Sequence, residues 1–150
     1  MKNIKSISDE TLISINTKPS VVINKFWLYA ERKIGAYPNP NKNCGKWLIF
    51  APITQIDDIW IKIKLATEEG KLGSSAKVST AKPNPNSTDA KKSVICVYTY
   101  DWTDKDDVMR IRQRLRELGI ISKIPYKADQ DTLKGKYANK GDKRISKYYE

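Results

Sequence analysis

One stretch of the chain, residues 96–119, constrains the fold most because it joins an apolar strand to an amphipathic helix. The strand begins CVYTY, and apolar residues then recur at the spacing of one helical face, at Val108, Ile111, Leu115 and Leu118. Thr103 followed by Asp106 predicts a capping box at the helix start, and Gly119 is typical of a left-handed C-cap. The sequence therefore predicts a strand followed directly by a helix.

The polar face of this helix is expected to carry a row of arginines, Arg110, Arg112, Arg114 and Arg116. Such a row can contact phosphate, but more often it is a solvated face paired with nearby acids. The acids Asp104, Asp106 and Asp107 are explained better by the helix dipole than by a metal site. Trp102 has two interpretations: a hydrophobic staple at the helix start, or an exposed platform for stacking a base.

The remaining apolar patterns predict further elements. Strands are expected at residues 26–31, 46–51, 76–80, 93–100 and 123–127. A second amphipathic helix is expected at 55–69, capped by Thr54 with Asp57 and ended by Gly70. The connection 82–92 is short and has no helical pattern, which favours antiparallel pairing of the two strands that it joins.

These elements predict an α+β domain with a curved, mostly antiparallel sheet, both helices on one face and the other face open to a ligand. The expected core is Trp47, Trp60, Val94, Val97, Ile111 and Leu115. Residues 1–150 are expected to form one domain, with a polar N-terminal arm at 1–19 and a basic, tyrosine-bearing tail at 129–150.

Charge indicates the class of partner. Lys and Arg number 28 against 17 Asp and Glu, a net charge of +11. A protein this basic attracts polyanions such as nucleic acid and nucleotides, although a lysine-rich solvated surface gives the same composition. No apolar run is long enough to span a membrane, and the first residues lack the apolar centre of a signal peptide, so a cytoplasmic protein is expected.

The residue types that the chain lacks limit the catalytic and metal sites that it could form. The chain has no histidine, which removes Ser-His and Cys-His nucleophile pairs and the commonest general base. It also has no CxxC pair, so a zinc site of common type is excluded. Cys96 lies in the apolar run VICVY and is interpreted as a reduced core residue, whereas Cys44 lies in a polar loop. No cofactor and no metal are expected.

Several strings resemble known families. GKWLI at residues 45–49, Ile59-Trp60 in the following helix and the strand leading into a basic helix that ends Leu-Gly-Ile resemble the second half of translation initiation factor 4E. The strings WLYAER, GKWLIF, SAKVSTA and VICVYTYDWTD are more similar to the family of basophilic-leukaemia-expressed protein, over most of residues 25–137. That family has no firmly assigned activity, but the resemblance implies the initiation-factor-4E-like fold.

Initiation factor 4E binds the mRNA cap in the concave face of its sheet, between two tryptophans, with basic residues on the phosphates. By resemblance, Trp27 corresponds to one stacking position and Tyr37 lies in the loop where the other is expected, although no Trp here precedes a Glu. Lys82 corresponds to a phosphate-binding residue, and Thr80 stands where an Arg would be.

The resulting candidate ligand-binding residues are Trp27, Tyr29, Tyr37, Lys77, Thr80, Lys82 and Trp102. The candidate contacts to nucleic-acid phosphate are Lys91, Lys92, Lys136 and Arg144. The tail from Lys134 to Tyr149 mixes basic and aromatic side chains, as proteins that bind single strands do.

Three functions remain open. The preferred hypothesis is a module that binds RNA or a phosphorylated nucleotide and has no catalytic activity. The alternative is a lyase that acts on a phosphorylated substrate by β-elimination, as a label sometimes given to the basophilic-leukaemia family implies; Lys77 is then the candidate base. A purely structural or protein-binding role is the third. The sequence gives no indication of oligomeric state.

Overall fold

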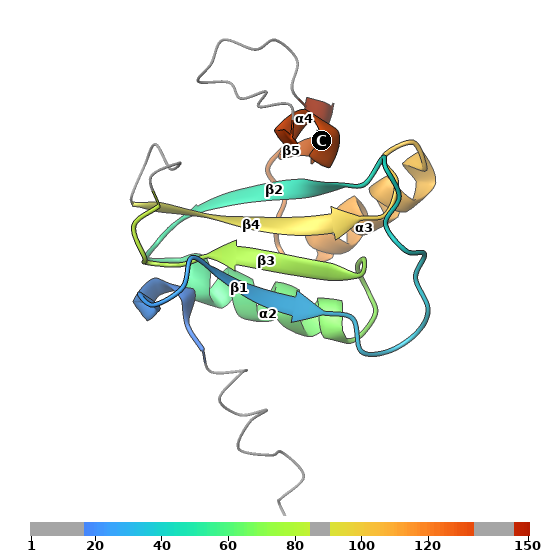
Figure 1. The fold of residues 1–150 in the computed structure, drawn as a ribbon. Helices are drawn as coiled ribbons and strands as arrows, with labels where there is room; N and C mark the ends of the chain where they lie inside the picture. Colours follow the sequence, from blue (N-terminus) through green and yellow to red (C-terminus); the bar gives the residue numbers. More distant parts are fainter. Residues whose placement is uncertain (1–16, 85–90, 134–145) are drawn as a thin grey trace, which may run out of the picture.

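The computed structural model describes residues 17–84, 91–133 and 146–150 and contains one six-stranded sheet (Figure 1). The strands are β1 Trp27–Glu31, β2 Gly45–Pro52, β3 Ser75–Ser79, β4 Lys92–Thr99, β5 Pro125–Ala128 and β6 Ser146–Tyr149. Their order in the sheet is β1-β3-β4-β2-β5-β6, and every neighbouring pair is antiparallel. The predicted antiparallel pairing of β3 with β4 is confirmed.

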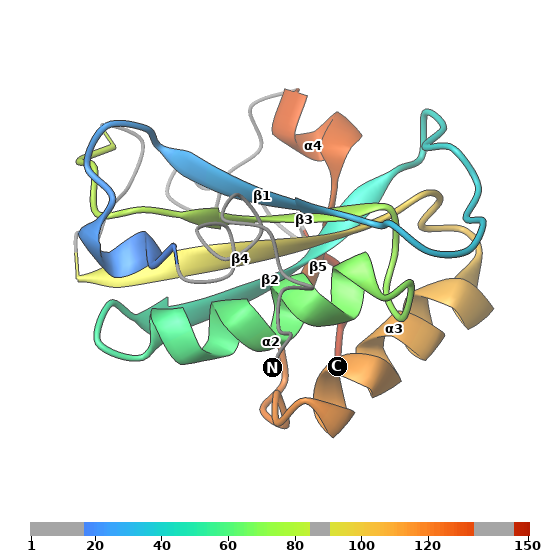
Figure 2. The same ribbon diagram turned by 90° about the horizontal axis from the view of Figure 1, so that it is seen from below.

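The two long helices, α2 Ile56–Glu68 and α3 Lys105–Glu117, cover the same face of the sheet (Figure 2). The short helix α4 Asp129–Leu133 lies on the opposite side, next to β2 and β5. A 3-10 turn, η2 Pro19–Val21, contacts α2. The expected α+β architecture is confirmed, and within the described residues no helix lies over most of the face opposite α2 and α3.

The core lies between the sheet and the two long helices. Trp47 is 0% exposed, and its indole Nε1 donates to the carbonyl of Val108, 3.1 Å away. The buried Tyr126 ring meets Trp47 edge to face, with 5.3 Å between centroids. Gly45 is required here because a Cβ would lie 2.6 Å from the Tyr126 hydroxyl oxygen. Burial of each such side chain contributes about 1.5–3 kcal/mol.

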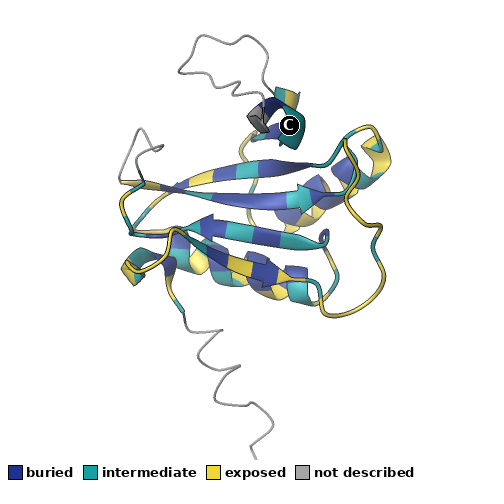
Figure 3. Ribbon diagram, viewed as in Figure 1, coloured by how far each residue is buried: buried dark blue, intermediate teal, exposed yellow. Residues whose placement is uncertain are grey.

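Five of the six predicted core residues belong to this cluster, namely Trp47, Trp60, Val97, Ile111 and Leu115. The prediction for Val94 is wrong. Strand residues alternate between faces, and Val94 lies opposite Phe50 on the uncovered face, whereas Ser93 and Ile95 point to the helices. Figure 3 shows this alternation of buried and exposed residues along the strands.

Both predicted helix caps are wrong in detail. The N-cap of α3 is Asp104, whose carboxylate accepts the backbone N–H of Asp107 at 3.2 Å, while the Thr103 hydroxyl donates to Asp101. The side chain of Asp101 also accepts the Thr103 backbone N–H, so Thr103 is held in a turn before the helix. Gly119 ends α3 with a φ of 100°, as predicted.

At α2 the N-cap residue is Gln55, and its side chain makes no capping hydrogen bond. Asp57 instead accepts two hydrogen bonds from Ser20, one from the backbone N–H at 3.0 Å and one from the hydroxyl at 2.5 Å. The first turn of α2 therefore fixes the chain that leads into β1. Gly70, with a φ of 78°, follows the end of α2, as predicted.

Arg112 is not on the polar face of α3, contrary to the prediction, but is 0% exposed. Its guanidinium donates to three backbone carbonyls, those of Ile120, Ser122 and Glu150, at 2.8, 2.8 and 3.0 Å. Position 112 lies four residues after Val108 and so belongs to the apolar stripe. These three carbonyls accept hydrogen bonds from the guanidinium N–H groups, which lowers the free-energy cost of burying the positive charge.

The predicted tail at 129–150 also contains regular structure. Its first residues form α4, and its last residues form β6, which pairs with β5 at the edge of the sheet. The Tyr148 hydroxyl donates to the carbonyl of Trp102 at 2.6 Å, which fastens this strand to the start of α3. Among the described residues, no helix has the length and apolar character needed to cross a bilayer.

Candidate functional site

The uncovered side of the sheet, here called the open face, carries three rows of side chains across β1, β3, β4 and β2. Opposite residues of an antiparallel pair project to the same face, so the strand register defines the rows. The first row is Trp27, Ser79, Val94 and Phe50, and the second is Tyr29, Lys77, Cys96 and Leu48. The third is Glu31, Ser75, Tyr98 and Lys46, and it extends to Lys127 on β5.

Lys77 stands at the centre of the aromatic part of the open face. Its Nζ lies 3.9 Å from the centroid of the Trp27 ring, and Tyr29 is opposite it on β1. Among the described residues, no carboxylate forms an ion pair with Lys77. The positive charge of Lys77 is therefore available to an anion on this face.

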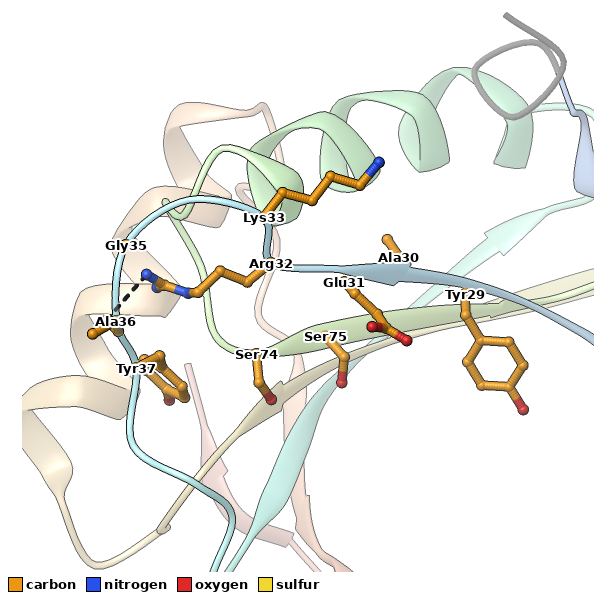
Figure 4. Close-up of a pocket in the computed structure, with 10 residues that line it drawn as sticks. All are labelled: Tyr29, Ala30, Glu31, Arg32, Lys33, Gly35, Ala36, Tyr37, Ser74 and Ser75. Atoms are coloured by element: carbon orange, nitrogen blue, oxygen red, sulfur yellow. Dashed lines mark hydrogen bonds between the residues drawn. The ribbon is translucent and has the colours of Figure 1, made fainter. Parts of the chain in front are cut away.

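A hollow of about 660 Å³ adjoins these residues at the end of β1. Tyr29, Glu31, Ser74 and Ser75 project into it from β1 and the start of β3 (Figure 4). Glu31 was missed in the sequence analysis, although the alternation of WLYAE places its carboxylate on the same face as Trp27 and Tyr29. A carboxylate beside exposed rings and hydroxyls can accept hydrogen bonds from the amino or imino groups of a base.

Tyr37 forms another wall of the hollow and is held rigidly. Its hydroxyl donates to the carboxylate of Asp107 at 2.6 Å and accepts the Tyr100 backbone N–H at 3.2 Å. Burial, reinforced by the bond to Asp107, raises the pKa of Tyr37 well above its ordinary value. The Arg32 guanidinium carbon lies 5.0 Å from the Tyr37 ring centroid, and Arg32 also donates to four loop carbonyls. This wall is therefore preformed.

The other edge of the open face is closed by α4. Lys46 is buried, and its Nζ lies 2.8 Å from Oδ1 of Asp129. The other carboxylate oxygen, Oδ2, lies 3.4 Å from the Cys44 sulfur. Burial, reinforced by Asp129, raises the pKa of the Cys44 thiol. Burial also raises the pKa of Tyr98 and takes that of Cys96 to about 11. Both cysteines are free and stay protonated at neutral pH.

The structure brings Trp27, Tyr29, Lys77 and Tyr37 to one part of the molecule. Thr80 follows β3 next to this group, and its backbone N–H donates to the carbonyl of Phe26 at 3.0 Å. Its side chain is buried, however, and the hydroxyl donates to the carbonyl of Lys25 at 2.5 Å, so it is not available to a ligand. Lys82 lies close by, with its Nζ 4.3 Å from the Phe26 ring centroid.

The remaining predicted residues lie in other parts of the chain. The Trp102 ring packs against the core and beneath Lys147 of β6, with 4.6 Å between that Nζ and the ring centroid. Lys92 begins β4 on the same face as Val94, and Lys91 precedes it; both are exposed. Lys136 and Arg144 lie outside the described residues.

The side chains on the open face are of the kinds that bind a ligand. Around a preformed hollow this face combines aromatic rings, the carboxylate of Glu31 and Lys77, which forms no ion pair among the described residues. Within residues 17–84, 91–133 and 146–150, no group of three or more His, Cys, Asp or Glu side chains is arranged to hold a metal ion. Such a face can stack a planar ring and attract a negative charge.

Residues 30–133 match the family of basophilic leukemia-expressed protein Bles03. The chain belongs to the Bles03 family. The match begins at Ala30, near the end of β1, and runs to α4, so it includes both long helices, whereas Trp27 and Tyr29 precede it. The resemblance noted from the strings WLYAER, GKWLIF and SAKVSTA is confirmed.

Solved structures of eIF4E share the fold of this Bles03-family chain. Caenorhabditis elegans eIF4E-3, in complex with the 4E-binding protein Mextli and a cap analog, has 21% identity and a TM-score of 0.61, over 84% of this chain and 77% of that one. Schistosome eIF4E, solved with m7GpppA and 4E-BP, has 17% identity and a TM-score of 0.64, over 94% and 79%. At these identities the likeness establishes the fold, and the predicted initiation-factor-4E-like architecture is confirmed.

Proposed function

We propose that this Bles03-family chain is a binding module for a phosphorylated nucleotide, free or within RNA, and that the ligand lies on the open face. The observation that carries the proposal is the Trp27–Lys77 pair, an aromatic ring and a cation without an acidic partner on the uncovered side of the sheet. In this proposal the ring of the base stacks on an aromatic side chain and Lys77 contacts phosphate.

Three features of the site support the proposal. Tyr29 is 64% exposed next to Lys77, which leaves a ring available for stacking. Glu31 supplies an acceptor for donors on a base edge, and the Tyr37 wall is rigid before any ligand arrives. The net charge of +11 adds long-range attraction for phosphate.

The fold neighbours agree with this class of ligand. The schistosome eIF4E structures were solved with m7GpppA and with m7GpppG, and the C. elegans protein with a cap analog. The present chain has its aromatic residues and its lysine on the open sheet face of the same fold. The neighbours therefore favour a nucleotide over other polyanions, although base identity and methylation are properties of those proteins alone.

No specific observation favours the lyase alternative. Lys77 lies over the face of Trp27, and an aromatic face attracts the ammonium form, whereas a general base must first lose its proton. The chain also has no histidine to serve as the acid in a β-elimination. The structure thus provides a reason for Lys77 to bind an anion and none for it to abstract a proton.

Calorimetric titration with ATP, GTP and a single-stranded RNA at several salt concentrations tests the proposal. We expect binding that weakens with salt, and Lys77→Ala together with Lys82→Ala should flatten the dependence by about 0.7–0.9 log units per lost phosphate contact. Lys62→Ala is the matched control, because Lys62 is exposed on α2 beyond the other face of the sheet. Absence of binding at low ionic strength, or equal effects of the Lys77 and Lys62 changes, would contradict the proposal.

A further inference from the structure

Phe50 is another large ring on the open face, on β2 and across the sheet from Trp27 and Tyr29. It is 56% exposed and lies beyond residues 45–47 of β2, which are the ones that pair with β5. Leaving a Phe side chain in water forgoes much of the roughly 1.5–3 kcal/mol that its burial would contribute. Val94 opposite and Leu48 two residues away are only half-buried, so Phe50 belongs to a continuous apolar strip on this face.

Phe50, like Trp27, has a lysine as a diagonal neighbour in the sheet. Trp27 has Lys77 as its diagonal neighbour on β3, and Phe50 has Lys92 as its diagonal neighbour on β4. Lys92 is exposed and, among the described residues, forms no ion pair. Diagonal neighbours in a sheet are about 7–8 Å apart, within reach of a long side chain. The open face therefore presents two ring–lysine pairs, and Lys77 and Lys92 lie on opposite sides of the row that contains the two rings.

The separation of the two pairs determines the ligand that could use both. Trp27 and Phe50 belong to the same row and are separated by three strand intervals, β1 to β3 to β4 to β2. With about 4.8 Å per interval, the rings are about 14 Å apart. Neighbouring bases stacked in one strand are only about 3.4 Å apart. A mononucleotide can therefore occupy one ring but not both, whereas a short single strand with splayed bases can cross the row.

We infer that Phe50 and Lys92 form a second base-stacking subsite, so that the open face binds a single-stranded nucleic acid that crosses the strands from Trp27 to Phe50. One base stacks at the Trp27–Lys77 end and a later base stacks on Phe50. Lys92 contacts the phosphate next to that later base. This inference rests on the proposed function, because it extends the nucleotide site at Trp27 into a binding track, here meaning the surface that runs across the strands from Trp27 to Phe50.

The charge distribution favours a nucleic acid as the occupant of the strip. Both rings of this row have a neighbouring lysine that forms no ion pair in the described part of the chain. The two lysines lie on β3 and β4, between the strands that carry the rings, where the phosphates that link two stacked bases would pass. A second copy of this strongly basic chain would bring like charges together on the same face.

The test compares a short and a long ligand on the same variants. Affinities for uridine monophosphate and for a single-stranded hexauridylate are measured by fluorescence anisotropy or calorimetry. Phe50→Ala should weaken hexauridylate binding by about 5- to 150-fold and leave uridine monophosphate binding unchanged, since one base stack is lost. Lys92→Ala should lower the salt dependence for hexauridylate only. Trp27→Ala should weaken both ligands.

The controls separate this inference from the function on which it rests. Ile121→Ala removes another exposed apolar side chain, which lies after α3 and outside the sheet, and should change neither affinity. Equal hexauridylate affinities of Phe50→Ala and the unchanged protein, with Trp27→Ala weakened, would overturn the track while leaving the nucleotide site intact. Loss of self-association in Phe50→Ala without loss of hexauridylate affinity would identify a second copy as the occupant. Failure of both ligands to bind would remove the proposed function as well.

Discussion

The ammonium of Lys77 lies 3.9 Å from the centroid of the Trp27 ring, on the face of the sheet opposite the buried residues of β1 and β3. Trp27 faces Ser79 across the strand pair, so Lys77 is its diagonal neighbour. The contact holds the lysine on the open face and leaves its donors directed to solvent, because no acid pairs with it among the described residues. It is the central element of the proposed site.

Lys77→Met should separate the two roles of this lysine. Methionine keeps much of the apolar chain length, so the free energy of unfolding should fall by only about 0.5–1 kcal/mol, the contribution of a partly exposed cation–π contact. Nucleotide affinity should fall much more, because the charge is lost, and Lys77→Arg should retain most of it. Urea denaturation and calorimetric titration of both variants measure the two effects. Equal nucleotide affinities of the Met and Arg variants would contradict a phosphate contact.

Arg112 should be among the most important polar residues for stability. Arg112→Met removes the guanidinium donor from the carbonyls of Ile120 and Ser122, and each part-buried group left unpaired costs about 1–3 kcal/mol, whereas the Glu150 carbonyl still accepts the Ile124 N–H. We expect a loss of at least about 2 kcal/mol in the free energy of unfolding. Arg114→Met, which loses only an exposed pair with Glu117, should change it by less than about 0.5 kcal/mol. Similar losses in the two variants would refute the assignment.

The start of α3 offers a test of the observed cap. Asp104→Ala removes the carboxylate that accepts the Asp107 N–H, and it should cost about 0.5–2 kcal/mol in denaturant unfolding. The same change also removes the acceptor of the Tyr100 hydroxyl. Thr103→Ala should cost less, because the Thr103 hydroxyl bonds to Asp101 in an exposed turn. A larger loss in Thr103→Ala would support the capping box that the sequence pattern indicated.

Cys96 should make stability depend on alkaline pH. Its pKa rises from 9.0 to about 11 on folding, because burial disfavours the thiolate. The folded state therefore gains stability fully below pH 9 and loses it as pH rises toward 11, by about 1.4 kcal/mol at about pH 10. The difference in unfolding free energy between the unchanged protein and Cys96→Val, measured from neutral pH to about pH 10, should move in favour of Val by that amount. A pH-independent difference would contradict the shift.

The order of the elements could be predicted because each helix has a clear apolar stripe and each strand is bounded by turn residues. The positions of individual side chains were harder. The run VICVY is apolar on both faces of β4, so the sequence does not indicate which of its residues face the helices. Val94 was therefore assigned to the wrong side of the sheet. Arg112 was assigned to the polar face because arginine is charged, whereas its spacing from Val108 and Leu115 places it in the buried stripe.

The candidate site was partly predictable for the same reasons. Trp27 and Tyr29 could be placed on one face because β1 alternates cleanly, and that alternation also includes Glu31. The sequence did not indicate that Phe50 belongs to the site, because an apolar residue in the string GKWLIF is expected to be buried. Its exposure follows only from the register of β2 with β4. Thr80 was carried over by resemblance, and its buried hydrogen bond to Lys25 depends on a contact between distant segments that the sequence does not reveal.

The most direct test of the open face as a nucleotide site is a 15N-resolved NMR titration of the full chain with ATP and GTP at low ionic strength. Shift changes should concentrate on the Trp27 indole N–H and on the backbone amides of β1 and β3 around Tyr29 and Lys77. Amides of exposed residues of α2, such as Lys62, should stay unchanged. Shift changes confined to α2 and α3, or no shift changes with either nucleotide, would contradict the account.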